Sequence, residues 1–315
     1  NMGLKDQIKH DERYDIAEEY LQVCYKLWEG SWEDDAVQLD KERGVYTDPG
    51  KVHDIHHEGK YFNVPGAHIS EPSPQRTPVI YQAGASKKGR AFAGRNAECV
   101  FINAPSLNVA KQTVDHIRAE VKEAGRAEEE VKILTMLTPI VGKTEEEAIG
   151  KYNDYKSHIS HEGAFALMGG WTGIDLSEYA PDENLRYVEN DSIQSAVEML
   201  TKIDADRKWT PNEIKNFAGI GGMGPVVVGN PEQIADTMEK WVDEAGVDGF
   251  NIAYAVTPGT FEDFVEYVVP VLQERGLIKK EYDGETLRDS LFGNGNYLPE
   301  HHPGKQYSYK RIVKN

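Results

Sequence analysis

The sequence predicts an α/β fold in which a parallel sheet is built from alternating strands and helices. Two observations support this: five short apolar runs are each followed by a helix-like segment, and the links between them are short. No G-x-G-x-x-G motif is present, which argues against an open doubly wound sheet. We therefore expect the later part of a (β/α)8 (TIM) barrel with insertions, without the N-terminal part of that barrel.

The chain begins with an expected helix over residues 11–28, in which apolar side chains recur every three or four positions. Residues 30–77 have no clear period and are rich in Asp, Gly, Pro and His. We interpret them as a long insertion with one short strand at 61–64. In a compact domain, an insertion of this length is more often functional than idle.

The strands and helices of the barrel follow this insertion. Apolar runs and the helical segments after them predict strand–helix units at 79–82 and 86–96, 98–103 and 109–124, 132–141 and 145–157, 226–229 and 231–245, and 249–254 and 260–275. A second irregular insertion is expected over residues 158–223. The tail over residues 277–315 is rich in Gly, Pro and Tyr and is expected to wrap the surface. These parts together predict one barrel domain over residues 1–315.

Composition excludes several classes of protein. Hydrophobic residues make up 39% of the 315 residues, which is enough for a core and argues against disorder. The formal net charge is −18, so binding to nucleic acid or an anionic membrane through bulk charge is not expected. Cys24 and Cys99 lie in apolar runs and are expected to be buried thiols. No apolar run is long enough to span a bilayer.

The turn before the helix at 86–96 is the first candidate site. Gly84, Ala85 and Ser86 lead from an apolar strand into that helix. The backbone N–H groups at a helix N-terminus and the helix dipole suit an anion, most often a phosphate. Ser86 would then be both the N-cap and a hydroxyl donor. The alternative is that Ser86 only caps the helix and Gly84 only turns the chain.

Histidines supply two further candidates. His10 and Tyr14 are four residues apart at the start of the first helix, so both side chains could reach a phosphate. The alternative is a cap residue followed by a core tyrosine. His53, His56 and His57 form the run HDIHH, but no partner motif for a metal accompanies it, so no metal site is predicted.

The apolar stretch within residues 160–181, SHEGAFALMGGWTGIDLSEYAP, is the third candidate. Phe165, Leu167, Met168 and Trp171 lie among glycines, which is typical of a moving lid or pocket wall that excludes water. The alternative is an ordinary buried loop.

Four segments of the chain closely resemble a known family. They are HDERYDIAEEYLQVCYKLWEGSWEDDAV, YTDPGKVHDIHHEGKYFNVPG, EPSPQRTPVIYQAGASKKGRAFAGRNAECVF and PVLQERGLIKKEYDGETLRDSLFGNGNYLPEHHP. The family is that of the reduced-flavin-dependent monooxygenases of the bacterial luciferase-like superfamily. The branch is that of nitrilotriacetate monooxygenase component A, which includes the long-chain alkane, dibenzothiophene sulfone and dimethyl-sulfide monooxygenases.

The resemblance implies a (β/α)8 barrel that holds FMN at its C-terminal mouth. By motif, Tyr14 and Ser86 correspond to ligands of the FMN phosphate, with His10 as a further candidate. The backbone of Gly84 and Ala85 would border the flavin. On this interpretation Phe165, Leu167, Met168 and Trp171 would form the dry wall of the substrate pocket. The resemblance gives no catalytic acid or base in this chain.

The resemblance also implies an activity. A separate NAD(P)H:flavin reductase would supply FMNH2, and one oxygen atom of O2 would enter a small, largely apolar substrate. Leu167 stands near the position of a histidine of the alkane enzyme, and the run ALMGGWTGID is more similar to the dimethyl-sulfide and nitrilotriacetate members. An organosulfur substrate such as dimethyl sulfide is therefore favoured over an alkane or an aminopolycarboxylate.

Other interpretations stay open at this point. One is an oxidoreductase of the same fold that uses deazaflavin and transfers hydride without oxygen. Another is an inactive fragment whose flavin site is incomplete. By resemblance we also expect a cytoplasmic protein that forms a homo-oligomer.

Overall fold

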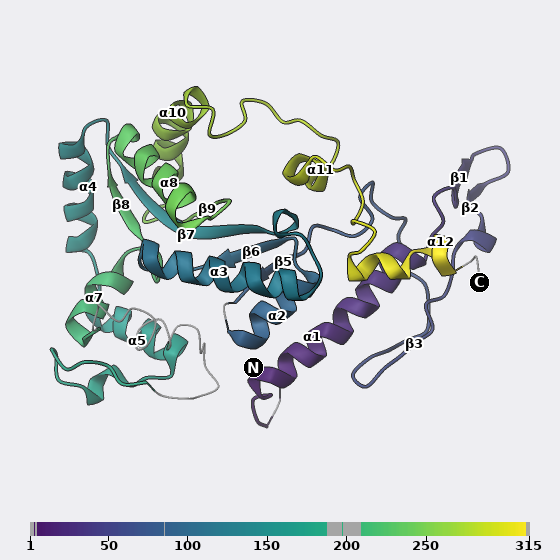
Figure 1. Ribbon diagram of the computed structural model, residues 1–315, viewed down its shortest axis with the longest axis horizontal. Helices are drawn as coiled ribbons and strands as arrows, with labels where there is room; N and C mark the ends of the chain where they lie inside the picture. The colour runs from purple at the N-terminus through teal and green to yellow at the C-terminus, as the bar shows by residue number, and fades with distance from the viewer. Residues whose placement is uncertain (1–2, 4, 85, 188–196, 198–208, 313–315) are drawn as a thin grey trace.

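A parallel sheet lies at the centre of the molecule (Figure 1). The computed structural model describes residues 3, 5–84, 86–187, 197 and 209–312. Among these residues the central sheet has five strands, and every pairing between them is parallel. The strands are β5 Tyr81–Ala83, β6 Cys99–Ile102, β7 Lys132–Val141, β8 Val226–Gly229 and β9 Gly249–Ile252. Each one lies within a predicted strand or overlaps it, which confirms the predicted parallel sheet.

The long strand β7 organises this sheet. Its first residues pair with β6, and its second half pairs with β8. The N–H groups of Lys132 and Thr138 donate to the carbonyls of Glu98 and Pro225 at 2.8 and 2.9 Å. Residues separated by an even number of positions point to the same edge of a strand, so β6 and β8 share one edge of β7. β9 pairs along the other edge, and the consecutive strands of the sheet are therefore β5, β6, β7 and β9.

Helices cover one face of the sheet. Val100 and Ile133 pack with Ile117 in one buried cluster, while Leu137 packs with Ile234 in a second. Each fully buried side chain of this size stabilises the fold by about 1.5–3 kcal/mol. The helices involved are α2 Lys87–Asn96, α3 Leu107–Glu123 and α8 Pro231–Ala245. Ile133 and Leu137 are four residues apart in β7, so both side chains point to the face of the sheet that these helices cover.

The other predicted helices are present with small shifts at their ends. The first is α1 His10–Tyr25, continued by the π-helical turn η1 Lys26–Gly30. The helix α4 Glu145–Ser157 has the predicted bounds. The last predicted helix is divided into α9 Gly259–Asp263, the π-helical turn η6 Phe264–Val268 and α10 Val269–Glu274. A short 3-10 turn, η3 Glu128–Glu130, precedes β7.

The first insertion holds more structure than predicted. Two antiparallel hairpins are present, β1 Val37–Asp40 with β2 Val45–Thr47, and β3 His57–Glu58 with β4 Asn63–Val64. A 3-10 turn, η2 Pro49–Lys51, lies between them. Only the position of β4 agrees with the predicted strand at 61–64. Such short strands have too few residues to show a period, so the sequence pattern missed them.

The prediction of an irregular second insertion is wrong for its described residues. Helices α5 His161–Thr172 and α7 Pro211–Gly219 lie in it, with a 3-10 turn at η4 Leu176–Glu178. The Ser160 hydroxyl accepts the N–H of Gly163 at 3.0 Å at the start of α5, and Gly173 ends it with φ +68°. Caps of this kind compensate for glycines that lower helix propensity inside α5.

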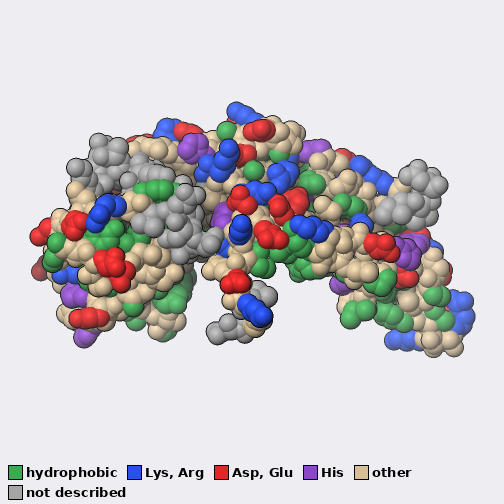
Figure 2. Space-filling view, turned by 90° about the horizontal axis from the view of Figure 1, so that it is seen from below, with side chains coloured by type: hydrophobic (Ala, Val, Ile, Leu, Met, Phe, Trp, Pro, Cys, Tyr) green, Lys and Arg blue, Asp and Glu red, His purple; other side chains and the backbone are tan. Residues whose placement is uncertain are grey.

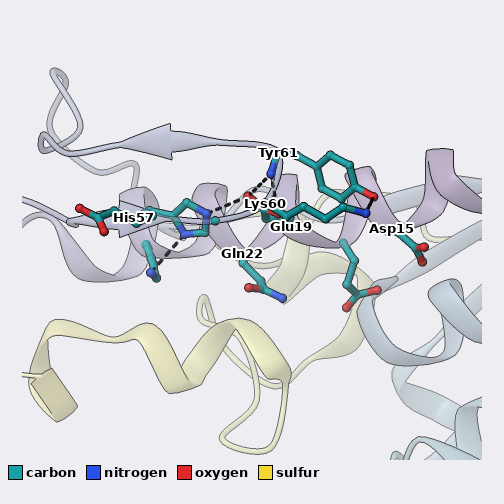
Figure 3. Close-up of a pocket in the computed structure, with 10 residues that line it drawn as sticks. Asp15, Glu19, Gln22, His57, Lys60 and Tyr61 are labelled. Carbon is teal, nitrogen blue, oxygen red and sulfur yellow. Dashed lines mark hydrogen bonds and ion pairs between the residues drawn. The ribbon is translucent and has the colours of Figure 1, made fainter. Parts of the chain in front are cut away.

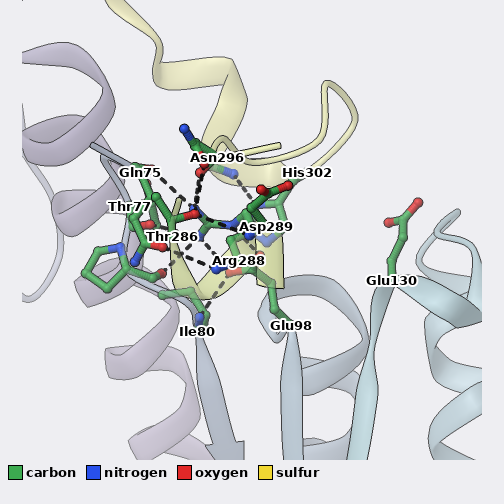
Figure 4. Close-up of polar contacts among 12 residues, drawn as sticks. Gln75, Thr77, Ile80, Glu98, Glu130, Thr286, Arg288, Asp289, Asn296 and His302 are labelled. Atoms are coloured by element: carbon green, nitrogen blue, oxygen red, sulfur yellow. Dashed lines mark hydrogen bonds and ion pairs between the residues drawn. The ribbon is translucent and has the colours of Figure 1, made fainter. Parts of the chain in front are cut away.

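The described part of the tail contains three short helical segments. It contains α11 Leu287–Phe292, the 3-10 turn η7 Pro303–Tyr307 and α12 Tyr309–Ile312. Arg288, 2% exposed, reaches Glu98, 3% exposed, with Nε to Oε1 at 2.6 Å and Nη2 to Oε2 at 2.9 Å. The same guanidinium donates to the carbonyls of Gln75, Thr77 and Asn296 (Figure 4). This contact joins the tail to the start of the sheet.

The surface and the thiols agree with the composition. Basic and acidic side chains are intermingled on the face shown in Figure 2, so this face carries no large patch of a single charge. Both cysteines, Cys24 and Cys99, are buried free thiols, as predicted. Within the part of the chain that the structure describes, no helix combines the length and the apolar character that crossing a bilayer requires.

The buried pair of Arg288 and Glu98 gives a test of the fold. Arg288→Met leaves a buried carboxylate without its cation and should lower the free energy of unfolding by about 3–5 kcal/mol. Arg43→Met is the control, because Arg43 pairs with Asp40 on the surface and should change stability by at most about 1 kcal/mol. Urea denaturation measures the free energy of unfolding of both variants. If both lost the same amount, the buried pair would stabilise the fold no more than the surface pair does.

Candidate functional site

The turn after β5 brings the predicted anion-binding residues together. Gly84 has φ +141°, and a Cβ built on it would lie 3.0 Å from the Tyr14 hydroxyl oxygen. A Cβ built on Gly89 would lie 2.6 Å from the same hydroxyl oxygen and 3.0 Å from Ser86 Oγ. The hydroxyl groups of Tyr14 and Ser86 therefore lie close together over the first turn of α2, and Tyr14 can approach this closely because residues 84 and 89 are glycines.

Ser86 caps α2 and still has a proton to donate. Its Oγ accepts the N–H of Gly89 at 3.1 Å, so its O–H can donate to another group. The first turn of α2 contains no acidic side chain and begins with Lys87 and Lys88. The helix dipole and these lysines make the turn locally positive in a chain of net charge −18. The capping interpretation and the anion interpretation of Ser86 are thus compatible.

Contacts between α1 and α2 hold Tyr14 over this turn. The Tyr14 ring packs against Phe92 with ring centroids 5.6 Å apart. Lys88 pairs with Asp15 at 2.8 Å, and Arg95 pairs with Glu18 at 2.9 Å. These pairs are partly exposed, so each contributes little alone, but together they fix the register of the two helices.

His10 lies beside Tyr14, as the spacing predicted. The two rings meet edge to face with centroids 5.3 Å apart, and His10 Nδ1 lies 2.9 Å from the Asp11 carboxylate. The structure therefore brings His10, Tyr14, Gly84 and Ser86 together, while Ala85 lies outside the described residues. Their role in binding a ligand stays a prediction.

Sequence reasoning missed one residue at this place. Gln82 on β5 is 8% exposed, and neither its amide oxygen nor its amide nitrogen has a hydrogen-bond partner among the described residues. Its nitrogen lies 3.2 Å from the position of a Cβ built on Gly84. A polar residue inside a short apolar strand was the available signal, since buried polar groups are normally paired.

The four predicted pocket residues on α5 do not share one environment. Met168 is fully buried in the main core cluster, and Phe165 and Trp171 pack against that cluster while partly buried. Leu167 is 41% exposed and points away from the core. The core packing supports a structural role for Met168, and the wall of a substrate pocket stays a prediction for all four.

The histidine run in the first insertion is divided among separate contacts. His53 Nε2 lies 2.9 Å from Glu33 Oε1, whereas His57 lies between Lys26 and Glu19 at 3.2 Å from each. No group of three or more metal-binding side chains occurs within the described ranges. These contacts hold the insertion in place.

A polar cavity of about 520 Å³ lies between α1 and the hairpin of β3 and β4 (Figure 3). It is lined by Asp15, Glu18, Glu19, Gln22, Lys26, His57, Glu58, Gly59, Lys60 and Tyr61. Glu19 accepts the backbone N–H groups of Tyr61 and Phe62 at 3.0 and 2.8 Å as well as contacting His57. The Glu19 carboxylate therefore fastens the hairpin to α1.

The chain belongs to the luciferase-like monooxygenase family, whose pattern matches residues 1–249. It is 52% identical to the dimethyl-sulfide monooxygenase of Hyphomicrobium sulfonivorans and 48% identical to the long-chain alkane monooxygenase of Geobacillus thermodenitrificans, in each case over 98% of this chain. Nitrilotriacetate monooxygenase component A of Aminobacter aminovorans is 36% identical over 92% of the chain. The chain spans 64, 66 and 65% of the lengths of these three relatives.

Solved structures give the same result for the fold. The crystal structure of DmoA from Hyphomicrobium sulfonivorans matches with a TM-score of 0.87 and 50% identity, over 100% of this chain and 67% of that one. A riboflavin lyase solved with modified FMN and riboflavin matches with a TM-score of 0.87 and 37% identity, over 96% of this chain and 67% of that one. The predicted family and its luciferase-like barrel fold are therefore confirmed.

The close approach of Tyr14 to α2 can be tested with one glycine. Gly89→Ala places a methyl group against the hydroxyls of Tyr14 and Ser86, so we expect a loss of about 1 kcal/mol or more in the free energy of unfolding. Gly150→Ala is the control, because nothing lies within 4 Å of its Cβ position in the middle of α4. That variant should stabilise the protein by about 0.5–1 kcal/mol. If urea denaturation showed the same rise in the free energy of unfolding for both variants, the close contact of Gly89 with Tyr14 would be contradicted.

Proposed function

We propose that this chain forms the flavin-binding part of an FMNH2-dependent monooxygenase. In this reaction one oxygen atom of O2 enters a small substrate and the other leaves as water. The observation that carries the proposal is the turn after β5, where two hydroxyl groups and a helix N-terminus lie close together. Such a group of donors is typical of a phosphate site.

The residues at this turn fit the phosphate of FMN. Tyr14 and Ser86 would each donate a hydroxyl proton to a phosphate oxygen, and the first backbone N–H groups of α2 would add further donors. His10 would form the outer side of the site. The absence of a Cβ at Gly84 and Gly89 lets the Tyr14 hydroxyl lie against this turn.

The flavin would supply the redox chemistry, and this chain would supply binding and orientation. When bound, reduced flavin provides the electrons that activate O2. Monooxygenase chemistry is supported by membership of the family and by the printed functions of the relatives. FMN as the cofactor is supported by the related riboflavin lyase structure, which contains modified FMN.

We further propose an organosulfur compound as the substrate, with an alkane or an aminopolycarboxylate as the alternatives. The run AFALMGGWTG on α5 has no charged side chain, so it offers no partner for a buried carboxylate. Phe165 and Trp171 are partly buried and apolar, and aromatic rings contact soft sulfur favourably. The identity of 52% to a dimethyl-sulfide monooxygenase supports the same choice.

The partner would be a separate NAD(P)H:flavin reductase. One relative is named as component A of its monooxygenase, which supports a two-component system. We place the protein in the cytoplasm and expect a homo-oligomer, both by analogy with the family.

Two hydroxyl groups test the phosphate site. Ser86→Ala and Tyr14→Phe should each weaken FMN binding by about 0.5–3 kcal/mol, because each removes one hydrogen bond to a charged group. Tyr20→Phe is the matched control, since Tyr20 lies on the same helix with its side chain exposed. Quenching of flavin fluorescence measures all three affinities. If FMN affinity is unchanged in both site variants, the assignment fails.

Oxygen consumption tests the reaction. The protein, a flavin reductase and NADH would be offered dimethyl sulfide, a long alkane or Mg-nitrilotriacetate in parallel, with product quantified in each. We expect coupled product from the organosulfur compound, because the α5 run lacks charged partners for a carboxylate. If nitrilotriacetate were the one substrate of the three that gave product, the proposal of an apolar pocket would be wrong. Reduction of substrate without oxygen uptake would indicate a hydride-transfer enzyme instead.

A further inference from the structure

Gln82 occupies a position where an apolar side chain would suffice for the fold. Along the sheet it pairs with Val100 of β6, which in turn pairs with Ile133 of β7. Val100 and Ile133 are fully buried in the main core cluster. Tyr81 and Ala83, on either side of Gln82 in β5, are exposed, so Gln82 lies on the opposite, helix-covered face. Gln82, Val100 and Ile133 are therefore neighbours across three strands, and Gln82 is the polar one of the three.

The side-chain amide of Gln82 has no hydrogen-bond partner among the described residues. It has one acceptor and two donor hydrogens, and none is used by a described residue. Leaving a buried polar group unpaired lowers stability, so such a group calls for an explanation. The buried amide of Asn96, by contrast, donates to Glu18 at 3.2 Å.

The protein groups beside this amide are the first candidates for its partner. Both polar atoms of the Gln82 side chain are closed to solvent, so a ligand cannot reach them directly. The Tyr14 hydroxyl is the nearby group, because it lies 3.0 Å from the Cβ position of Gly84 while the Gln82 nitrogen lies 3.2 Å from that position. No hydrogen bond joins the Tyr14 hydroxyl to another described residue, so its oxygen is available to accept one.

We propose that Gln82 is a positioning residue for Tyr14, and this rests on the phosphate site proposed above. When Tyr14 donates its hydroxyl proton to the phosphate, the Gln82 amide N–H donates to the Tyr14 oxygen. A hydroxyl that accepts one hydrogen bond donates a stronger one, so the two bonds support each other. Gln82 thereby makes the site selective for flavin that carries a phosphate.

A double-mutant cycle tests this role. Gln82→Met replaces the amide with an apolar side chain of similar length, and Gln112→Met is the matched control, because Gln112 is a half-buried amide on α3 that donates to Asn108 at 3.4 Å. FMN and riboflavin affinities would be measured by fluorescence for the wild type, both single variants, Tyr14→Phe and the double variant Tyr14→Phe/Gln82→Met. We expect Gln82→Met to weaken FMN binding roughly three- to tenfold and to leave riboflavin binding unchanged.

The cycle separates this role from a structural one. If Gln82 acts through the Tyr14 hydroxyl, Gln82→Met has no further effect on FMN affinity in the Tyr14→Phe background. The midpoint of thermal unfolding without ligand should also rise or stay constant, because an unpaired buried amide is removed. Additive effects of the two substitutions, or an equal loss of FMN and riboflavin binding, would overturn the proposal.

Two further outcomes are distinguishable. If the wild type binds FMN no better than riboflavin, the phosphate site itself is wrong. If the wild type prefers FMN and Gln82→Met keeps the full preference, only the role of Gln82 is wrong. Should Gln82→Met not fold, Gln82→Glu serves instead: its carboxylate would accept the Tyr14 proton and should reduce FMN affinity but not riboflavin affinity.

Discussion

The ion pair between Arg288 and Glu98 is the contact on which the rest of the structure depends. Besides binding Arg288, Glu98 accepts the N–H of Ile80 at 3.0 Å through its side chain and the N–H of Lys132 at 2.8 Å through its carbonyl. One residue thus connects the tail with the starts of β5, β6 and β7. Because β5 has three residues and a strand rises by about 3.3 Å per residue, fixing its start also places Gly84 at its end. A structural pair therefore determines where the candidate site lies.

The alternating pattern of the sequence predicted most of the sheet because strands and helices of this kind carry local signals. The strand β7 and the helices α4 and α8 have the bounds that periodicity and capping residues indicate. The helix α5 was missed because its glycines weaken the helical pattern, although Ser160 before it and Gly173 after it are cap signals that could have been used. The shared edge of β7 carries no local signal, so it could not be predicted.

The candidate site also has some residues that local sequence patterns indicate and others that they do not. The spacing of His10 and Tyr14 and the small-residue turn before Ser86 are local patterns, and they correctly indicated residues that lie together. Gln82 has a sequence signal, a polar residue inside a short apolar strand, but its lack of a hydrogen-bond partner is visible only in the packed structure. Arg288 and Glu98 are 190 residues apart in the chain, so no local pattern could indicate their pairing.

The charges of the chain limit how it can hold an anion. With a net charge of −18, the protein as a whole repels a phosphate group. Near the turn, however, Asp15 and Glu18 are paired with Lys88 and Arg95, and the first turn of α2 has no carboxylate. Exposed charges further away are screened within about 8 Å at physiological salt. A phosphate at this site would therefore be held by short-range donors, namely the two hydroxyls and the helix N-terminus at the turn.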